Sequence, residues 1–161
     1  MGRWLVRLVG GATALVAAVA TVFLLGMRTK SPAVLDRVRR FNRAVTNPRV
    51  LRSAGSPGAS ASVIRHVGRV SGRQYETPVG PHVVGDGFVI ALPYGPGADW
   101  ARNVLARTSA TLVHEGRTVP VDRPQVVPTT HVLSDLPSSE RRTLRVFGVD
   151  QCLRLRRVPE G

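Results

Sequence analysis

Two arginines, Arg69 and Arg73, flank the turn Ser71-Gly72 in the stretch HVGRVSGRQYETPVG. Successive backbone N–H groups from Gly68 to Gly72 can form an anion-binding nest, and the Ser71 hydroxyl can donate a hydrogen bond. Either arginine can pair with phosphate oxygens. These residue types at this spacing therefore predict the binding of an anionic ligand, although in isolation the same stretch is also typical of a solvated hairpin.

A second stretch, ALPYGPGADWARNVLA, combines a Gly-containing loop with a predicted helix. Trp100 and Asn103 are three residues apart and share one face of that helix. The sequence contains no motif for other common chemistries: it has no phosphate loop, no dinucleotide glycine pattern, no nucleophile elbow and no carboxylate pair suited to hydrolysis. The four histidines are widely spaced and have no Cys or carboxylate at ligand spacing, so a metal site is not expected.

The 161 residues suffice for one domain plus an appendage. The formal charge of +13 is carried by 22 arginines and one lysine, and residues 1–52 hold ten basic groups against one acid. Because the excess charge is N-terminal and aromatic residues make up only 5% of the chain, nucleic acid is not an expected partner. The single cysteine, Cys152, excludes an intrachain disulfide and favours a cytosolic domain.

An uncharged run of twenty residues, 8–27, is long enough to span a bilayer, so residues 1–30 are expected to form an N-terminal membrane anchor with a transmembrane helix. More basic residues follow this run than precede it, which predicts an N-out, C-in orientation with the domain in the cytoplasm. The alternative is a signal peptide whose cleavage would lead to secretion.

Residues 31–61 are predicted to form a basic amphipathic helix followed by a linker. Ser31 is the expected N-cap, Pro32 the first helical residue, and the helix is expected to end before Asn47-Pro48. The helix suits either a surface position on the domain or a place on anionic lipid. The Gly/Pro/Ser/Ala-rich stretch RSAGSPGASAS forms the linker.

In residues 62–161, short apolar runs alternate with turn signals, which predicts a mainly β, α+β domain. We expect a small barrel of about six mostly antiparallel strands with two short flanking helices. The strands are expected in SVIRHVG, TPVGPHVV (where Pro81 is a potential interruption), FVIALPY, ATLVHEGRTVPV (a hairpin turning at Glu115-Gly116) and QCLRLRRV. The helices are GADWARNVLART and LPSSERRTLRVFGV, the second capped by Ser138 or Ser139 and closed by Gly148.

Taken together, the two stretches resemble the deazaflavin-dependent nitroreductase family, whose members bind coenzyme F-420. The family pattern is a G-R-x-[ST]-G-[KR] turn with T-P soon after it, then an apolar strand, a Gly-containing loop and a W-x-x-N-[LV] helix. The matching residues are Gly68, Arg69, Ser71, Gly72, Arg73, Thr77, Pro78, Tyr94, Gly95, Gly97, Trp100, Asn103 and Val104. RFNRAVTNP also looks like the lead-in of that family, so the resemblance covers roughly residues 38–158.

This resemblance implies a split β-barrel of the flavin-reductase type, and hydride transfer from reduced coenzyme F-420 to a quinone, nitro compound or similar acceptor, which the anchor would place at the cytoplasmic membrane face. The cofactor carries this chemistry, so no protein nucleophile is expected. Tyr75 and Tyr94 are candidates for the acceptor pocket. The expected cofactor-binding residues are Gly68, Arg69, Val70, Ser71, Gly72, Arg73, Thr77, Pro78, Pro93, Tyr94, Gly95, Trp100 and Asn103.

The chain departs from the family just after the turn, where Gln74, Tyr75 and Glu76 replace a further basic residue. Glu76 would repel an anionic ligand if it pointed inward. Because of this departure, FMN is kept as an alternative cofactor, less favoured than coenzyme F-420. The alternative function is that of a non-catalytic carrier of deazaflavin, FMN or lipid. The expected partners are the small-molecule acceptor and membrane lipid, and a homodimer remains an alternative to a monomer.

Overall fold

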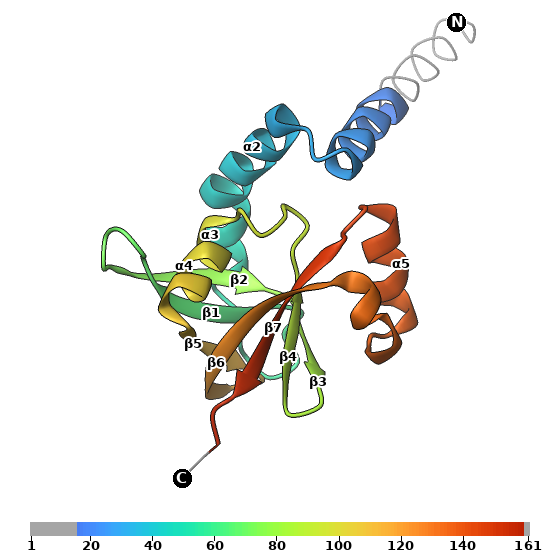
Figure 1. Ribbon diagram of the computed structural model, residues 1–161. Coiled ribbons are helices and arrows are strands. Elements are labelled where there is room, and N and C mark those ends of the chain that lie inside the picture. The colour runs from blue at the N-terminus through green and yellow to red at the C-terminus, as the bar shows by residue number, and fades with distance from the viewer. Residues whose placement is uncertain (1–15, 160–161) are drawn as a thin grey trace, which may run out of the picture.

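The computed structural model describes residues 16–159 of the chain, in which a helix over residues 16–28 precedes an α+β domain (Figure 1). Three consecutive helical segments follow it: α2 (Pro32–Phe41), the π-helical η1 (Asn42–Thr46) and α3 (Asn47–Val50). The strands are β1 (Ser62–Val67), β2 (Gln74–Val79), β3 (Pro81–Val84), β4 (Gly87–Ala91), β5 (Ser109–His114), β6 (Arg117–Pro128) and β7 (Gln151–Arg157). The remaining helices are α4 (Asp99–Arg107), α5 (Ser138–Val146) and the short 3-10 turns η2 (Thr129–His131) and η3 (Leu133–Asp135).

In the described part of the chain, the strands form one seven-stranded sheet in the order β2-β1-β5-β6-β7-β4-β3, and every neighbouring pair is antiparallel. The sheet curls into a half-barrel, which confirms the expected mainly β, α+β fold. There is one strand more than expected because the run TPVGPHVV splits at Gly80. Its two halves become the two edge strands, β2 and β3, so a single residue joins opposite edges of the sheet.

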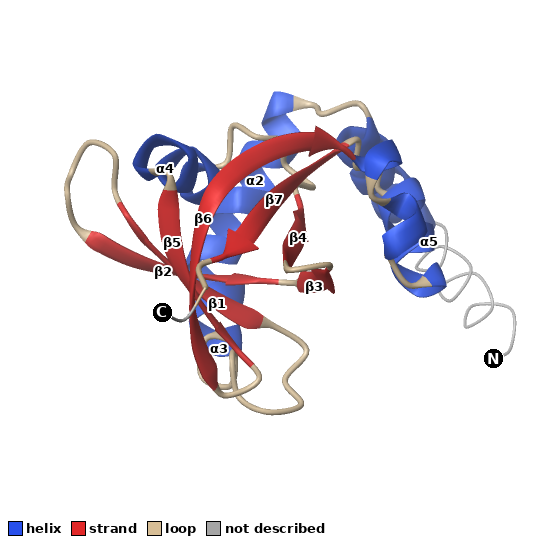
Figure 2. Cartoon of the chain, turned by 60° about the horizontal axis from the view of Figure 1, so that its bottom comes forward, coloured by secondary structure: helices blue, strands red, loops and turns tan. Residues whose placement is uncertain are grey.

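The longest strand, β6, links the two halves of the curl because it pairs with β5 on one side and with β7 on the other. Its register with β7 shifts between Asp122 and Gln125, and Arg123 there has a φ of +49°. A bulge of this kind bends a strand and increases its twist. Figure 2 shows β6 arching over the half-barrel.

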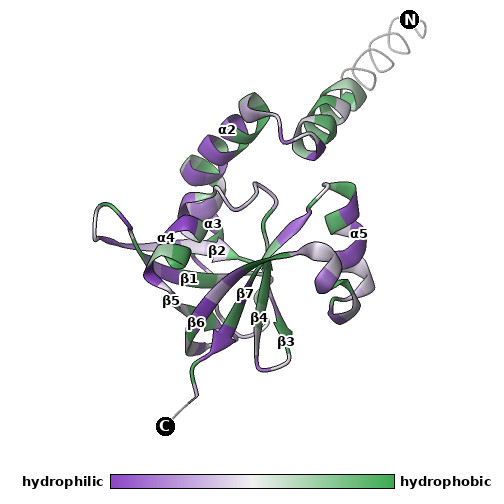
Figure 3. Cartoon of the chain, viewed as in Figure 1, coloured by the Kyte–Doolittle hydropathy of each residue, from purple (hydrophilic) through white to green (hydrophobic). Residues whose placement is uncertain are grey.

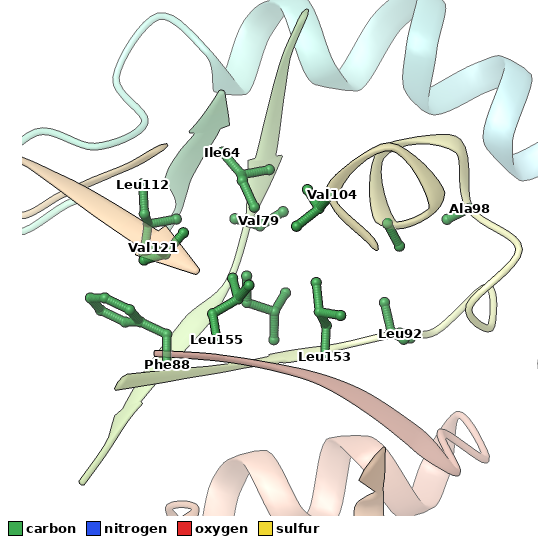
Figure 4. Close-up of a cluster of buried hydrophobic side chains, with 12 residues drawn as sticks. Ile64, Val79, Phe88, Leu92, Ala98, Val104, Leu112, Val121, Leu153 and Leu155 are labelled. Carbon is green, nitrogen blue, oxygen red and sulfur yellow. The ribbon is translucent and has the colours of Figure 1, made fainter. Parts of the chain in front are cut away.

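The main core fills the inside of the curl. Ile64 of β1 and Leu112 of β5 face Phe88 of β4 and Leu155 of β7, and Val104 of α4 packs beside them (Figure 4). All five side chains are fully buried or nearly so. Each contributes roughly 1.5–3 kcal/mol by leaving water, so the curl is stabilised by its two halves packing against each other.

A second apolar cluster lies on the outer face of β4 and β7, where α5 covers them. Leu144 of α5 packs with Val89 and Cys152. Strand β4 is therefore buried on both faces, with Phe88 and Ile90 turned inward and Val89 turned toward α5. This explains why FVIALPY is a continuous apolar run rather than an alternating one.

The helical segment α2–η1–α3 begins where the sequence predicted, with Ser31 at the N-cap and Pro32 in the first turn. The Ser31 side chain, however, makes no capping hydrogen bond. The predicted end before Asn47-Pro48 is wrong. The chain widens instead into η1, where the Asn47 N–H donates to the Asn42 carbonyl, and then continues as α3. Pro48 lies in the first turn of α3, where its missing N–H is tolerated, so the π-turn lets the helical segment pass the proline.

The predicted cap of α5 is also wrong, because Pro137 occupies the N-cap position and Ser138 and Ser139 are already helical. No side chain caps this end. The expected stop is confirmed: Gly148, which follows the helix, has a φ of +60°, a conformation that glycine adopts without a steric penalty.

The linker after α3 is held by backbone hydrogen bonds. The Gly55 N–H donates to the Ala61 carbonyl at 2.7 Å, and the Gly116 N–H donates to the Gly55 carbonyl at 2.6 Å. The Gly58 N–H donates to the Glu115 carboxylate at 2.8 Å. Because Glu115 and Gly116 form the predicted β5–β6 hairpin turn, the linker is fastened to that turn.

Within residues 16–159, no helix combines the length and apolar character needed to cross a bilayer. The predicted span 8–27 begins in residues 8–15, which lie outside the described residues, so the span stays a prediction. The helix over residues 16–28 is largely apolar (Figure 3). It leaves several large apolar side chains exposed, namely Val16, Val19, Val22 and Leu25.

The end of this N-terminal helix is fastened to the C-terminal end of α5. The Arg28 guanidinium donates to the Arg145 carbonyl at 3.0 Å, and the Lys30 ammonium donates to the Gly148 carbonyl at 2.8 Å. Cations are favoured at a helix C-terminus, where the backbone carbonyls carry a partial negative charge. The first described helix therefore has a defined position on the domain.

Gly87 provides a test of the packing of β4 against β7. A Cβ at Gly87 would collide with the Leu155 carbonyl, whereas a Cβ at Gly80 would meet nothing within 4 Å. We expect Gly87→Ala to lower the free energy of unfolding by about 1–3 kcal/mol and Gly80→Ala to change it by less than about 0.5 kcal/mol. Urea unfolding of the full-length variants measures both, and equal effects would contradict this packing.

Candidate functional site

A cavity of about 690 Å³ opens between the β1–β2 hairpin, the loop after β4, the start of α4 and the helical segment α2–η1. Its apolar floor comes from the inside of the half-barrel, with Val79, Ile90 and Leu92 among the residues that line it. Polar and charged side chains surround this floor. A ligand with an apolar body and polar ends matches such a lining.

The cavity brings together most of the residues that the sequence singled out. The predicted cofactor-binding residues that line it are Gly68, Arg69, Val70, Ser71, Thr77, Pro78, Pro93, Tyr94, Gly95, Trp100 and Asn103, and Tyr75 lies there too. Gly72 and Arg73 are the exceptions, because both are exposed at the far side of the turn and do not line the cavity. The two stretches quoted from the sequence thus meet in space, while their role in cofactor binding stays a prediction.

The hairpin turn uses much of its own hydrogen-bonding capacity. The Gly68 N–H donates to the Arg73 carbonyl at 2.8 Å, and the Gly72 N–H donates to the Gly68 carbonyl at 3.0 Å. Within the described chain, the amides of Val70 and Ser71 donate no hydrogen bond. The expected anion nest is therefore reduced to two backbone donors at the tip of the turn.

A chain of hydrogen bonds connects this turn to the sheet and to α4. The Asn103 side-chain oxygen accepts from the Arg69 guanidinium at 2.8 Å and from the Arg69 backbone N–H at 3.1 Å. Its amide nitrogen lies 3.2 Å from His66 Nδ1, and His66 Nε2 lies 3.2 Å from the Thr77 hydroxyl. Both ends of the Asn103 amide are therefore engaged by protein groups, and Asn103 holds Arg69 in place.

These hydrogen bonds also determine which ring nitrogen of His66 carries the proton. Since the Asn103 amide group must donate to Nδ1, that nitrogen is an acceptor, and the proton resides on Nε2, which donates to Thr77. His66 is buried, and this burial lowers the pKa of its imidazole below the ordinary value of 6.5. The ring of Tyr75, a residue that is itself partly exposed, stacks on the imidazole with ring centroids 5.8 Å apart.

Charged groups at the mouth of the cavity are paired across elements. The Asp99 carboxylate lies 3.2 Å from the Arg69 guanidinium and 3.4 Å from that of Arg43 in η1. Asp99 is exposed, so these ion pairs stabilise the fold by less than about 1 kcal/mol each. Glu76 pairs with Arg65, its neighbour on the adjacent strand, at 2.8 Å. This arginine offsets the negative charge of Glu76, which the sequence analysis identified as unfavourable for an anionic ligand.

Tyr94 connects the loop after β4 to α2 and η1. The Arg39 guanidinium donates to the Tyr94 carbonyl at 2.9 Å, and the Asn42 amide donates to the Tyr94 phenol oxygen. Burial raises the pKa of this phenol above its ordinary value of 10.0, and the contacts with Asn42 and Arg39 oppose that rise only in part. Tyr94 therefore stays protonated at neutral pH.

Sequence reasoning missed two groups of cavity residues. His66 was considered only as a metal ligand, although its place two residues after Ile64 on a strand predicts an inward position. The arginine-rich face of the basic helix was expected to face solvent or lipid, whereas Arg39, Asn42 and Arg43 line the cavity; helical spacing shows only that the three share one side of the helix. That this side covers the cavity depends on contacts that the sequence pattern does not contain.

Comparisons with known proteins leave the family of this chain unassigned. Neither a known family nor a curated protein matches its sequence. Among solved structures it is similar to an F-420 reductase, at 12% identity over 67% of this chain and 92% of that chain, with a TM-score of 0.47. It is similar to a heme storage protein from Vibrio cholerae at 12% identity, over 63% and 82% of the two chains, with a TM-score of 0.47. It is also similar to an FMN-binding protein from Syntrophomonas wolfei at 14% identity, over 77% and 92%, with a TM-score of 0.40. These likenesses are too distant to assign a function to this chain.

The neutral state of His66 predicts a pH-dependent stability. Because its folded-state pKa is lowered, the unfolded chain takes up a proton as the pH falls through about 6.5, while the folded chain resists protonation. The contribution of the neutral His66 to the free energy of unfolding is therefore complete above pH 6.5, and it is lost as the pH falls toward the lower folded-state pKa.

His66→Gln keeps one acceptor and one donor without titrating, so we expect a flatter dependence of the free energy of unfolding on pH between about 7 and 5. Urea unfolding at a series of pH values measures it. The matched control is His131→Gln, at an exposed residue, which should keep the wild-type pH dependence. An unchanged slope in His66→Gln would exclude a buried neutral His66.

Proposed function

We propose that the chain is a deazaflavin-dependent oxidoreductase, which uses reduced coenzyme F-420 to reduce a quinone, nitro compound or similar acceptor. One observation carries this proposal. The two stretches that resemble the deazaflavin-dependent nitroreductase family are far apart in sequence but line the same cavity. If the hairpin were only a solvated turn and the helix only a core element, we would not expect their matched residues to line one cavity.

The cavity has properties that suit such a coenzyme. Its volume of about 690 Å³ lies within the range of small-molecule sites. The floor formed by Val79, Ile90 and Leu92 is apolar and suits a flat ring system, while the Val70 and Ser71 amides and Arg69 suit an anionic tail. Among the described residues, the buried Nε of Arg39, which also lines the cavity, has no hydrogen-bond partner. A donor left unpaired in this way favours a site that a ligand completes.

The chain would act by binding, orienting and shielding. Arg69, held by Asn103, is proposed to pair with the anionic tail, and Trp100 to pack on the ring. The helical segment α2–η1 covers the cavity and would exclude water from it. When bound, the reduced coenzyme supplies a hydride. A quinone that receives this hydride, with its two electrons, needs one further proton from solvent to become the hydroquinone, and the coenzyme is left oxidised.

Cofactor binding tests this proposal directly. We expect the full-length protein to bind oxidised coenzyme F-420 more tightly than FMN, as measured by calorimetric titration, and to oxidise the reduced coenzyme in the presence of menadione. Arg69→Ala should weaken F-420 binding about 10-fold or more, as expected for a lost charged hydrogen bond.

Arg73→Ala is the matched control, because Arg73 belongs to the same turn but does not line the cavity, and it should bind F-420 like the wild type. The absence of F-420 binding would refute the proposal, and preferred binding of FMN would change the cofactor. Tight F-420 binding without turnover of menadione or a nitro acceptor would identify a non-catalytic carrier instead.

We also propose that the apolar N-terminal segment holds the domain at the cytoplasmic face of a membrane, where lipid-soluble quinones are concentrated. Two features support this. The uncharged run 8–27 has the length of a membrane span, and the helix over residues 16–28 leaves apolar side chains exposed. The arginines and the lysine that follow the run favour the cytoplasmic side.

Fractionation of cells that express the full-length protein tests this placement. We expect the protein to stay in the membrane fraction after a carbonate wash, and we expect Val19→Arg combined with Val22→Arg to release it, because each charge in the apolar run costs about 2.5–3.5 kcal/mol. Val83→Arg, at an exposed apolar residue of β3, is the control and should leave the protein in the membrane fraction. Wild-type protein in the soluble fraction would contradict the placement.

A further inference from the structure

We infer that α2 and Tyr94 form an acceptor subsite that selects ligands by an uncharged oxygen, of the carbonyl, quinone or nitro type, through the Tyr94 O–H and the Arg39 Nε–H. The inference rests on the proposed function and adds the residues that would determine which acceptors the same cavity takes. It also gives the acceptor an orientation, with its oxygen toward α2.

The Tyr94 hydroxyl has a donor to spare. Its oxygen accepts the hydrogen bond from the Asn42 amide, so its own hydrogen has to be donated elsewhere. Within residues 16–159 the Tyr94 hydroxyl donates to no other group. The phenol lines the cavity and, because burial raises its pKa, keeps its proton at neutral pH. The Tyr94 O–H is therefore free to donate to a ligand.

Arg39 supplies a second spare donor on the same wall. One terminal nitrogen of its guanidinium lies 3.3 Å from the Asp36 carboxylate, and the other donates to the Tyr94 carbonyl at 2.9 Å. The Nε–H of Arg39 is buried and has no hydrogen-bond partner among the described residues. The guanidinium carbon lies 5.9 Å from the centre of the Tyr94 ring, so the two side chains are neighbours.

The charges and apolar groups around these two donors limit the class of ligand that can bind here. The Arg39 guanidinium already has Asp36 as its ion-pair partner, so a ligand bound here needs no negative charge of its own. The floor beside it, with Ile90 and Leu92, is apolar. An acceptor with a flat apolar body and an uncharged oxygen fits both features. As a hydride adds to such an acceptor, negative charge develops on its oxygen, and donors that point to that oxygen stabilise it.

The test compares two ligands that differ in their oxygens. Menadione and 2-methylnaphthalene share the fused rings and the methyl group, and only menadione has carbonyl oxygens. Each is titrated by calorimetry into the full-length protein without coenzyme. We expect menadione to bind more tightly, and we expect Tyr94→Phe and Arg39→Lys each to weaken menadione about 3- to 10-fold, the range of a lost neutral hydrogen bond, with no change for 2-methylnaphthalene.

Two matched variants serve as controls. Arg40→Lys changes an exposed arginine of the same helix, and Thr130→Val removes an exposed hydroxyl; neither residue lines the cavity. Both should keep the wild-type preference for menadione. Thermal unfolding of Tyr94→Phe close to that of the wild type would confirm that the lost affinity is local.

The outcomes separate this inference from the proposed function. If the wild type binds F-420 but Tyr94→Phe and Arg39→Lys bind menadione unchanged, the acceptor subsite is refuted and the proposed function stands. If both variants lose the preference for menadione but F-420 does not bind, the oxygen-selective wall is supported and the deazaflavin function is refuted. An equal affinity of the wild type for menadione and 2-methylnaphthalene would also refute the subsite.

Discussion

A single residue, Gly80, joins the two outermost strands of the sheet, and the rest of the structure depends on this short connection. Val79 ends β2 at one edge and Pro81 begins β3 at the opposite edge. Two residues apart, their Cα atoms can be separated by no more than about 7 Å. A flat seven-stranded sheet would hold its edges several times farther apart, since neighbouring strands are about 4.8 Å apart. The sheet therefore has to curl.

The curl creates both the core and the cavity. One part of the concave side is filled by apolar side chains from opposing strands, such as Ile64 and Leu155, which pack against each other. Near the Gly80 junction the concave side stays open as the cavity. There Val79 and Ile90 form a floor, and polar groups from the hairpin and from α4 surround it. The junction thus places a ligand-sized space next to the predicted binding motifs.

The polar side of this space is organised by buried and half-buried side chains that hydrogen-bond to one another. His66, Asn103, Arg69 and Thr77 come from the hairpin and from α4, and no member can change its hydrogen bonding without leaving a neighbour unpaired. On the other side, α2 and η1 hold the loop after β4 by Arg39 and Asn42, and Lys30 also lies 3.4 Å from the Pro93 carbonyl of that loop. The helical segment before the half-barrel therefore forms part of the cavity wall.

The sequence by itself determined the local structure. It showed which runs are buried strands, placed the hairpin turn at Glu115-Gly116 and the stop after α5 at Gly148, and singled out two stretches whose residues line one cavity. These features depend on hydrophobic periodicity and on glycine conformations, which are properties of a few neighbouring residues. Local turn chemistry did not show that Pro48 would be passed by a π-turn, because the helix continues through contacts with the barrel.

The tertiary structure alone decided which faces meet. It turned the polar side of α2 onto the cavity, buried His66 in a hydrogen-bond chain, left Arg73 outside the cavity lining and paired Glu76 with Arg65. A periodic pattern states that a face is polar or apolar but not what lies opposite it. That choice follows from the curl of the sheet, which brings together residues that are distant in the chain.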